Sequence, residues 1–396
     1  MKINQWTMGL AAAGVISFAA VAQAEEKPTH QVLTAVSSTT LSGYVSTSAI
    51  WRPGTDDAAS QNKTRTYDGV SKQDGFNLDV INIKISKRLD ESEWASGYVA
   101  ELLVGPDTGV FQTGGSGGVQ IKQAYVALNA PVGNGITFKM GVFDTPIGYE
   151  AYNYTDNPNY SRSIGWQLEP STYTGLMASY KLCDAVSISA AVFNNPGASV
   201  NINGRSATES EKGYLAVLTV TAPDSFGFLK GSSLTAGVVD HDSAGGFGAN
   251  TRNIVNWYVG ATFNTPIEAL KVGVAFDYVG ISEYNDLNNS SYANATSIYL
   301  SYAVTEKLKV NTRAEYGSGS SDAPGGPFRD LAKAGDDKNS QFFSLTGTVD
   351  YALWANVVSR AEVRWDADVS GGPQSFGGAA DEKHALTFAV NVIYKF

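Results

Sequence analysis

The chain has one cysteine, Cys183, among 396 residues, together with only three histidines and four methionines. A single cysteine allows no internal disulfide bond, so the stability of the fold has another source. Three scattered histidines and one thiol argue against a transition-metal site. His241 is followed by Asp242 and Ser243, but neighbours along a strand point to opposite faces, which argues against a catalytic set. We therefore expect no enzymatic activity, no cofactor and no bound metal.

Long hydrophobic runs are also missing beyond the first residues. After residue 24, no segment approaches the roughly 18 uninterrupted apolar residues of a membrane-spanning helix. The first residues carry Lys2, an uncharged apolar stretch over 8–22 and the small residues Ala22 and Ala24 around a cleavage site. This pattern predicts a secretory signal peptide over 1–24, because the apolar stretch is too short to span a bilayer. If the mature chain enters a membrane, we expect it to do so as strands.

Positive charge is in short supply. The chain has 28 Lys and Arg against 38 Asp and Glu, and removal of residues 1–24 takes away one Lys, leaving 27 against 38, a net charge of −11. Such a surface repels nucleic acid. The 41 glycines and 20 tyrosines instead suit short strands, tight turns and aromatic residues at a membrane interface.

The end of the chain shows the clearest pattern that is present. Six large apolar residues of one parity alternate with Thr387, Asn391 and Lys395, and they are Leu386, Phe388, Val390, Val392, Tyr394 and Phe396. A strand that turns six large apolar side chains to one side, with no chain beyond to cover them, is typical of a strand facing lipid. This terminal strand, with Tyr394 and Phe396 at its end, also resembles the signal that the insertion machinery of outer-membrane barrels recognises.

Similar alternation recurs in sixteen segments, after a polar stretch over 25–40 that we interpret as a periplasmic lead-in. The predicted strands are 41–51, 76–89, 94–104, 119–130, 136–143, 171–182, 185–194, 213–222, 233–241, 253–264, 270–282, 293–303, 307–317, 342–351, 355–366 and 384–396. The links between them alternate strictly between long and short, with 223–232 intermediate. We therefore predict an all-β fold over 41–396: a transmembrane antiparallel up-and-down β-barrel of about 16 strands, with short periplasmic turns and long extracellular loops.

The polar parity of several strands is charged, which a dry core would not tolerate. The basic candidates for the lumen wall are Lys139, Arg313, Arg360 and Arg364. Because a 16-strand barrel encloses an aqueous channel, we expect these side chains to face water. One strand is ambiguous: Asp79 and Lys84 have opposite parities, which implies either a bulge near residues 80–81 or a mistaken register.

The link over 144–170 differs from the other long links because it is rich in tyrosine and tryptophan. Glu150, Asp156 and Glu169 are its acidic candidates. If the link folds into the barrel, these carboxylates face the basic wall and create a transverse field across a narrowed pore. The alternative is an extracellular cap packed on the rim of the barrel.

Four stretches carry a resemblance to a known family: QAYVALNAPVGNG, GVFDTPIGYE, NPNYSRS and PSTYTGLMASYKL. They resemble the bacterial β-barrel porins described as OmpL-like, most clearly over 94–195. The resemblance implies an outer-membrane pore and identifies no ligand residues. Porins of this general architecture are commonly trimers, so a homotrimer is possible for this chain.

Together these observations predict an outer-membrane porin that lets ions and small hydrophilic solutes diffuse through a water-filled barrel surrounded by outer-membrane lipids. The rival from another class is a barrel with a blocked lumen that acts as an adhesin or structural anchor. An active transporter with a plug domain needs about 22 strands, which 396 residues cannot supply together with the plug.

Overall fold

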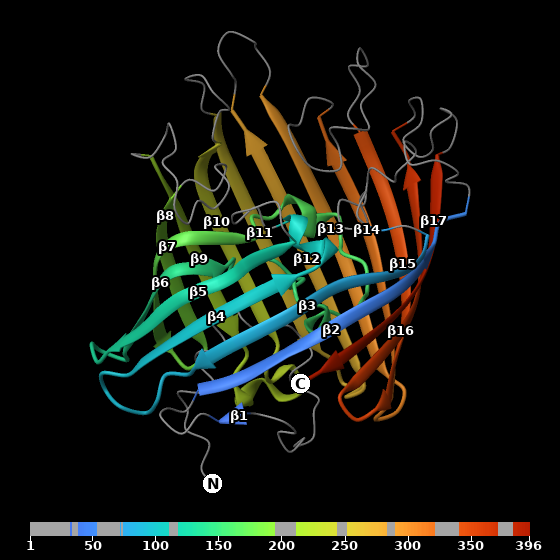
Figure 1. The fold of residues 1–396 in the computed structure, drawn as a ribbon. Coiled ribbons are helices and arrows are strands. Elements are labelled where there is room, and N and C mark those ends of the chain that lie inside the picture. The colour runs from blue at the N-terminus through green and yellow to red at the C-terminus, as the bar shows by residue number, and fades with distance from the viewer. Residues whose placement is uncertain are drawn as a thin grey trace.

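Sixteen antiparallel strands close into a barrel in the computed structural model of the chain (Figure 1). The structure describes residues 32–33, 39–53, 72, 74–110, 118–194, 211–243, 252–282, 290–320, 340–370 and 383–396. Each strand from β2 (Thr39–Trp51) onward pairs with the next, and β17 (His384–Lys395) pairs with β2 to close the cylinder. The predicted 16-strand barrel is confirmed.

The other strands follow in chain order. They are β3 (Gly75–Lys87), β4 (Ser96–Val104), β5 (Val119–Ala130), β6 (Ile136–Asp144), β7 (Thr172–Cys183), β8 (Val186–Asn194), β9 (Lys212–Thr221), β10 (Ser233–Ser243), β11 (Arg252–Asn264), β12 (Leu270–Ile281), β13 (Ser291–Ala303), β14 (Leu308–Gly319), β15 (Ser340–Trp354) and β16 (Val357–Asp368). A two-residue strand, β1 (Val32–Leu33), pairs with the start of β2.

Four short 3₁₀ helices lie in the links: η4 (Pro106–Val110), η5 (Tyr154–Asp156), η6 (Gly165–Leu168) and η7 (Asp224–Leu229). No helix in the described part of the chain is long and apolar enough to cross a membrane. Link lengths alternate around the barrel with one exception. The link 222–232, which contains η7, is longer than the link 244–251 at the opposite end.

The two parities of each strand meet different surroundings, as β17 shows. Phe388, Val390 and Val392 are exposed on the outside, while Ala389, Asn391 and Ile393 of the other parity are buried on the inside. The terminal Phe396 exchanges two backbone hydrogen bonds with Gly43 of β2, at 2.9 and 3.0 Å. The last residue of the chain is therefore paired at the seam where the barrel closes.

Two β-bulges turn a charged side chain toward the inside. Asp79 is the extra residue where the pairing of β2 with β3 slips between Ser46 and Thr47. Lys122 is the extra residue where the pairing of β4 with β5 slips between Glu101 and Leu102. A bulge re-aims one side chain, so it also explains the parity conflict in β3.

The inner face has two chemically distinct parts, which we name here. The charged wall consists of Asp79 on β3, Arg313 and Glu315 on β14, and Arg360, Glu362 and Arg364 on β16, all buried. The apolar wall consists of Tyr173 and Met177 on β7, Phe193 on β8, Leu215 and Val217 on β9, Val239 on β10 and Tyr258 on β11, which form one buried cluster. Each wall faces the link between β6 and β7.

Candidate functional site

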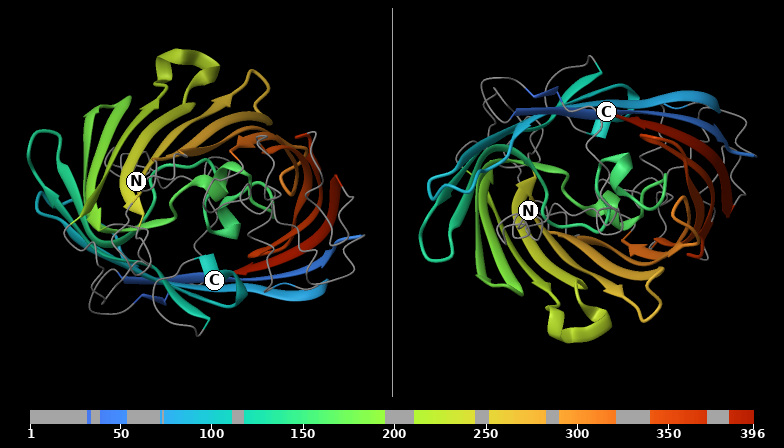
Figure 2. Two further views of the ribbon diagram at one scale, coloured as in Figure 1. Left: turned by 90° about the horizontal axis from the view of Figure 1, so that it is seen from above. Right: turned by 90° about the horizontal axis from the view of Figure 1, so that it is seen from below.

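Residues 145–171, which we call the inner loop, lie inside the barrel, and Figure 2 shows them crossing its interior. The loop carries η5 and η6, and most of its central side chains are buried. An irregular segment inside a barrel forms few backbone hydrogen bonds within itself, so its backbone N–H and C=O groups need other partners. The walls provide those partners.

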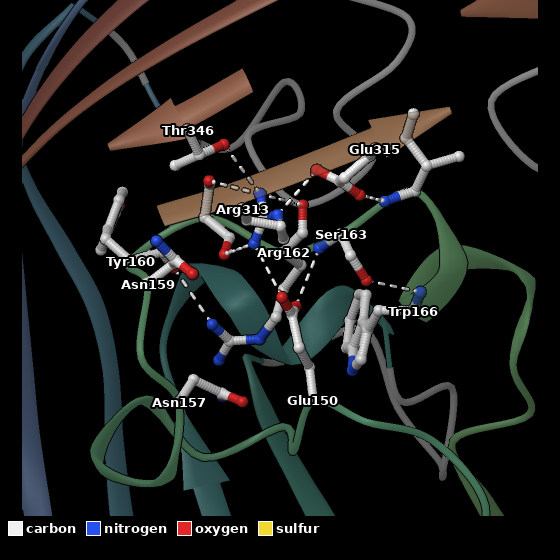
Figure 3. A network of polar contacts seen from close by, with 12 residues as sticks. Glu150, Asn157, Asn159, Tyr160, Arg162, Ser163, Trp166, Arg313, Glu315 and Thr346 are labelled. Atoms are coloured by element: carbon white, nitrogen blue, oxygen red, sulfur yellow. Dashed lines mark hydrogen bonds and ion pairs between the residues drawn. The ribbon is translucent and has the colours of Figure 1, made fainter. Parts of the chain in front are cut away.

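Carboxylates of the charged wall accept hydrogen bonds from the backbone of the loop. The amides of Tyr160 and Ser161 donate to Glu362 at 2.6 and 2.9 Å. The amide of Ile164 donates to Glu315 at 2.6 Å, as Figure 3 shows from close by. Hydrogen bonds to a charged acceptor are stronger than neutral ones, so these carboxylates fix the path of the backbone.

Arginines of the same wall donate to carbonyl oxygens of the loop. Arg360 binds the carbonyls of Tyr154 and Asn157, both at 2.8 Å. Arg313 binds those of Ser161 and Arg162 at 2.9 and 3.1 Å, and Arg364 binds that of Arg162 at 2.6 Å. Both types of orphan backbone group in the loop are thus satisfied by charged side chains.

The guanidinium of Arg313 lies at the centre of this contact. It forms ion pairs with Glu150 of the loop at 2.7 Å and with Glu315 at 2.6 Å, and all three side chains are fully buried (Figure 3). Arg162 of the loop donates to the carbonyls of Tyr152 and Tyr160, and its guanidinium lies 4.8 Å from the Tyr154 ring centre. Carbonyl groups of the loop are therefore bound by a cation of the loop itself, Arg162, as well as by arginines of the charged wall.

A second ionic cluster holds the loop at β3. The ammonium of Lys72 pairs with Asp79 at 2.8 Å and with Asp107 at 3.0 Å, and it donates to the hydroxyls of Tyr154 and Tyr160. The Lys72 and Asp79 side chains have no exposed surface. Lys72 thus joins the first long link, η4 and the inner loop.

On the opposite side the loop meets the apolar wall and the strands beside it. Ile147 occupies the space that a side chain at Gly237 of β10 would need, and Tyr149 does the same at Gly273 of β12. The Tyr149 ring stacks on Tyr299 of β13, with centres 4.0 Å apart. Because these inward-facing glycines have no side chain, each leaves a recess that a side chain of the loop fills. Burial raises the pKa of Tyr149 to about 12.

A carboxyl pair lies where the loop meets β12. Glu169 of the loop and Asp277 are hydrogen-bonded through their carboxyl groups, and Gly165 leaves room for the Asp277 carboxylate. Burial, and then the negative charge of Asp277, raises the pKa of Glu169 well above its usual range. Two adjacent buried carboxyls share a proton because both cannot ionise together, so the contact is a hydrogen bond and not an ion pair.

The residues predicted from sequence occupy several environments. Glu150 and Arg313 are in direct contact, so no water-filled gap separates this pair. Arg360 and Arg364 hold the loop backbone. Lys139 lies elsewhere on β6, half-buried, with its ammonium 5.1 Å from the Tyr125 ring centre.

The remaining predicted residues are placed as follows. Asp156 is half-buried and accepts a hydrogen bond from Asn153 at 3.1 Å. Tyr394 is exposed on the outer face of β17, and Phe396 lies at the barrel seam. The signal peptide 1–24 lies outside the described residues, as does all of the lead-in 25–40 except residues 32–33 and 39–40.

Sequence reasoning missed three cations: Lys72, Lys122 and Arg162. Lys122 forms ion pairs with Glu101 and Asp144, and its inward direction depends on a bulge that the parity pattern hides. Lys72 lies in a long link without periodicity. Arg162 is the single basic residue of the aromatic link, and no spacing or parity in that link indicates that it binds the backbone carbonyls around it.

Known proteins share this architecture. No curated protein sequence matches the chain. Among solved structures, the anion-selective porin from Comamonas acidovorans has a TM-score of 0.60 at 12% identity, covering 90% of this chain and 99% of that one. The outer membrane channel DcaP of Acinetobacter baumannii has a TM-score of 0.58 at 13% identity, covering 90% and 97%. The trimer form of OmpT, an outer membrane protein of Vibrio cholerae, has a TM-score of 0.56 at 15% identity, covering 90% and 99%. These likenesses show the fold, and the family is shown by a sequence model matching residues 38–396: the chain belongs to the family described as "Putative beta-barrel porin-2, OmpL-like".

Proposed function

We propose that the chain is an outer-membrane porin for passive diffusion of ions and small hydrophilic solutes. The proposal is supported by the closed 16-strand barrel, by family membership and by an inner face rich in charged and hydroxyl side chains. A barrel of this size has room for an aqueous channel. Neither the family nor the structural neighbours lend support to an adhesin or anchor.

The observation that carries the mechanism is the attachment of the inner loop on two sides. Arg313 and Arg360 bind it on the charged wall, and Ile147 and Tyr149 enter recesses on the other side. We assign residues 144–170 as the constriction because a loop attached on both sides divides the lumen and leaves a narrowed path beside it.

Within this proposal the predicted site residues have two roles. Glu150, Arg313, Arg360 and Arg364 set the width of the path by fixing the loop, since they are buried and bound. Lys139, Asp156 and Glu169 are half-buried, so their charge or polarity is available to solutes in the lumen. Solutes are then filtered by size at the loop and by charge along the path between the loop and the wall.

The wider assignments belong to the same proposal. Residues 1–24 act as a signal peptide, 25–40 as a periplasmic lead-in, and Tyr394 and Phe396 as the signal for barrel insertion. OmpT is described in a trimer form, and we propose a homotrimer here. We propose no catalytic role: His241 is buried on the inner face, and the following Asp242 belongs to the opposite parity.

Conductance in planar lipid bilayers tests the proposal. Purified, folded protein is expected to add stepwise, ohmic conductance, and a variant that lacks residues 150–166 is expected to give larger steps because the crossing segment is gone. Heat-unfolded protein is the control. If folded protein gives no conductance, the porin proposal is wrong, and a barrel with a blocked lumen becomes the better interpretation.

A further inference from the structure

Four lysines surround the lumen near the short turns. Lys271 and Lys309 are the second residues of β12 and β14, Lys139 is the fourth residue of β6, and Lys84 is the fourth from the end of β3. We call these four the lysine ring. β3 and β6 lie across the barrel from β12 and β14 (Figure 2), so the ring has members on opposite sides.

The register of the strands places these lysines on the inner face. In the register of β3 and β4, Lys84 lies directly opposite Glu101, which is buried inside the barrel. Lys309 precedes by two residues Asn311, which is buried on the inner parity that also contains Arg313. Lys271 has the same relation to Gly273, against which Tyr149 of the inner loop packs. Residues two apart on a strand share a face.

The inward direction of Lys139 follows from its ring contact with Tyr125, a residue packed against the buried apolar cluster. All four lysines are only half-buried. In the part of the chain that the structure describes, none of them forms an ion pair. The deeper cations differ, since Lys72, Lys122 and Arg313 each have carboxylate partners within 4 Å.

Carboxylates, in contrast to these lysines, are rare on the inner face next to the short turns. Among the described strand ends, the inner positions within five residues of a short turn contain one carboxylate, Asp350, and it is paired with Arg360 at 3.1 Å. Many of the other inner positions there are serine, threonine or asparagine, and Lys181 of β7 differs from the ring because it is paired with Asp184 at 2.8 Å. Deeper inside, Glu101 and Asp144 are both paired with Lys122, and Glu169 shares a hydrogen bond with Asp277. Glu101 and Asp144 also attract Lys84 and Lys139, so they are the main opposing charges on that side of the ring.

We propose that the lysine ring makes the pore prefer small anions, such as halides, phosphate and short carboxylates, over cations of similar size. The inference rests on the proposed porin function and names its solute class. Unpaired ammonium groups on opposite walls of a low-dielectric barrel raise the local concentration of anions between them. Because the groups are half-exposed, the preference weakens as added salt shortens the screening length, which is about 10 Å at 0.1 M.

Reversal potentials across a KCl gradient test this inference. The wild-type pore is expected to pass chloride about 3-fold more readily than potassium at 0.1 M mean salt, and the K84Q/K139Q/K271Q/K309Q variant to fall to a ratio of about 1. The matched control is K230Q/K307Q, which removes exposed positive charges from short turns outside the lumen. This control is expected to keep the wild-type ratio. Circular dichroism confirms that each variant is folded.

The outcomes separate the two proposals. An open pore that prefers cations, or a ratio that the fourfold variant leaves unchanged, would overturn the lysine ring while leaving the porin intact. An equal shift in the control variant would also overturn it, because surface charge would then be the cause. Folded wild-type protein without conductance would overturn the porin, and the lysine ring with it.

Discussion

The charged wall and the apolar wall hold the same loop by different chemistry. The charged wall binds backbone groups through Arg313, Glu315 and Glu362, whereas the apolar side receives the side chains of Ile147 and Tyr149 in recesses left by glycine. Ionic contacts in a buried site are directional, and each depends on its partner being present. Apolar contacts depend on volume. We call residues 147–150 the apolar arm of the loop and residues 154–164 its charged arm. The comparison predicts that the two arms detach separately, the charged arm when an ionic partner is lost and the apolar arm when side-chain volume is lost.

Loss of the Arg313 guanidinium is expected to have the largest effect. R313M leaves Glu150 and Glu315 buried without their partner, and breaking a buried ion pair from one side costs about 3–5 kcal/mol. At tenfold for each 1.4 kcal/mol, hydrogen exchange at the amides of Ser161 and Ile164 should rise by more than about 100-fold. Single-channel conductance should rise as the loop leaves the wall.

The triple variant R313M/E150Q/E315Q is the control, because it removes the stranded charges together with the guanidinium. It is expected to recover much of the amide protection. If R313M alone exchanges at the wild-type rate, the charged wall does not hold the loop.

Truncation on the apolar side comes second. I147A removes a buried side chain from the recess at Gly237 and should cost about 2–4 kcal/mol, because it leaves a cavity. Amide exchange should increase around residues 147–150 and stay near the wild-type rate at Ser161 and Ile164. Equal acceleration of both arms would show that the loop leaves as one unit and that the two walls are not independent.

The strands and the inner charges were accessible to sequence reasoning for a physical reason. Period-2 alternation between lipid and water is a strong constraint on every strand, so the inner parity could be predicted for Arg313, Arg360 and Arg364, which are buried in the structure. Parity states which face a residue is on and says nothing about its partner. It therefore left the direct contact of Arg313 with Glu150 unseen.

The remaining contacts follow from features without a local pattern. A bulge changes parity by one residue, which hid Lys122 and left Asp79 ambiguous. The recesses at Gly237 and Gly273 look like ordinary strand glycines until a distant loop is placed against them. Long-range packing of an irregular segment is decided by shape, and no periodicity records it.

The carboxyl pair of Glu169 and Asp277, at the edge of the apolar side, is expected to make the docking of η6 depend on pH. Burial raises the pKa of Glu169 in the folded state above its unfolded value of about 4.3. Its contribution to docking is therefore fully present below pH of about 4.3 and is lost as pH rises through the raised pKa, by at most about 1.4 kcal/mol per pH unit. Amide exchange around η6 should accelerate over that window in the wild type.

The E169Q/D277N variant keeps a hydrogen bond between the two side chains and removes both ionisable carboxyls, so exchange around η6 should become insensitive to pH over that window. Glu150 and Glu315 also act on the carboxyl pair, and both stay paired with Arg313. If the wild type and the E169Q/D277N variant show the same pH dependence, a group outside the carboxyl pair titrates, and the pair contributes to docking by packing alone.

The smallest effect is expected where the apolar side has a polar contact. Y149F removes the hydroxyl that accepts a hydrogen bond from Thr262 at 3.2 Å, and it keeps the ring that stacks on Tyr299. The net worth of such a bond is about 1 kcal/mol, so exchange around residues 147–150 should rise by less than about tenfold. Y149A is the matched comparison and should cost about 3–5 kcal/mol, because it empties the recess at Gly273. If Y149F costs as much as Y149A, the hydroxyl and not the ring holds this arm, and the apolar side would work by the same directional chemistry as the charged wall.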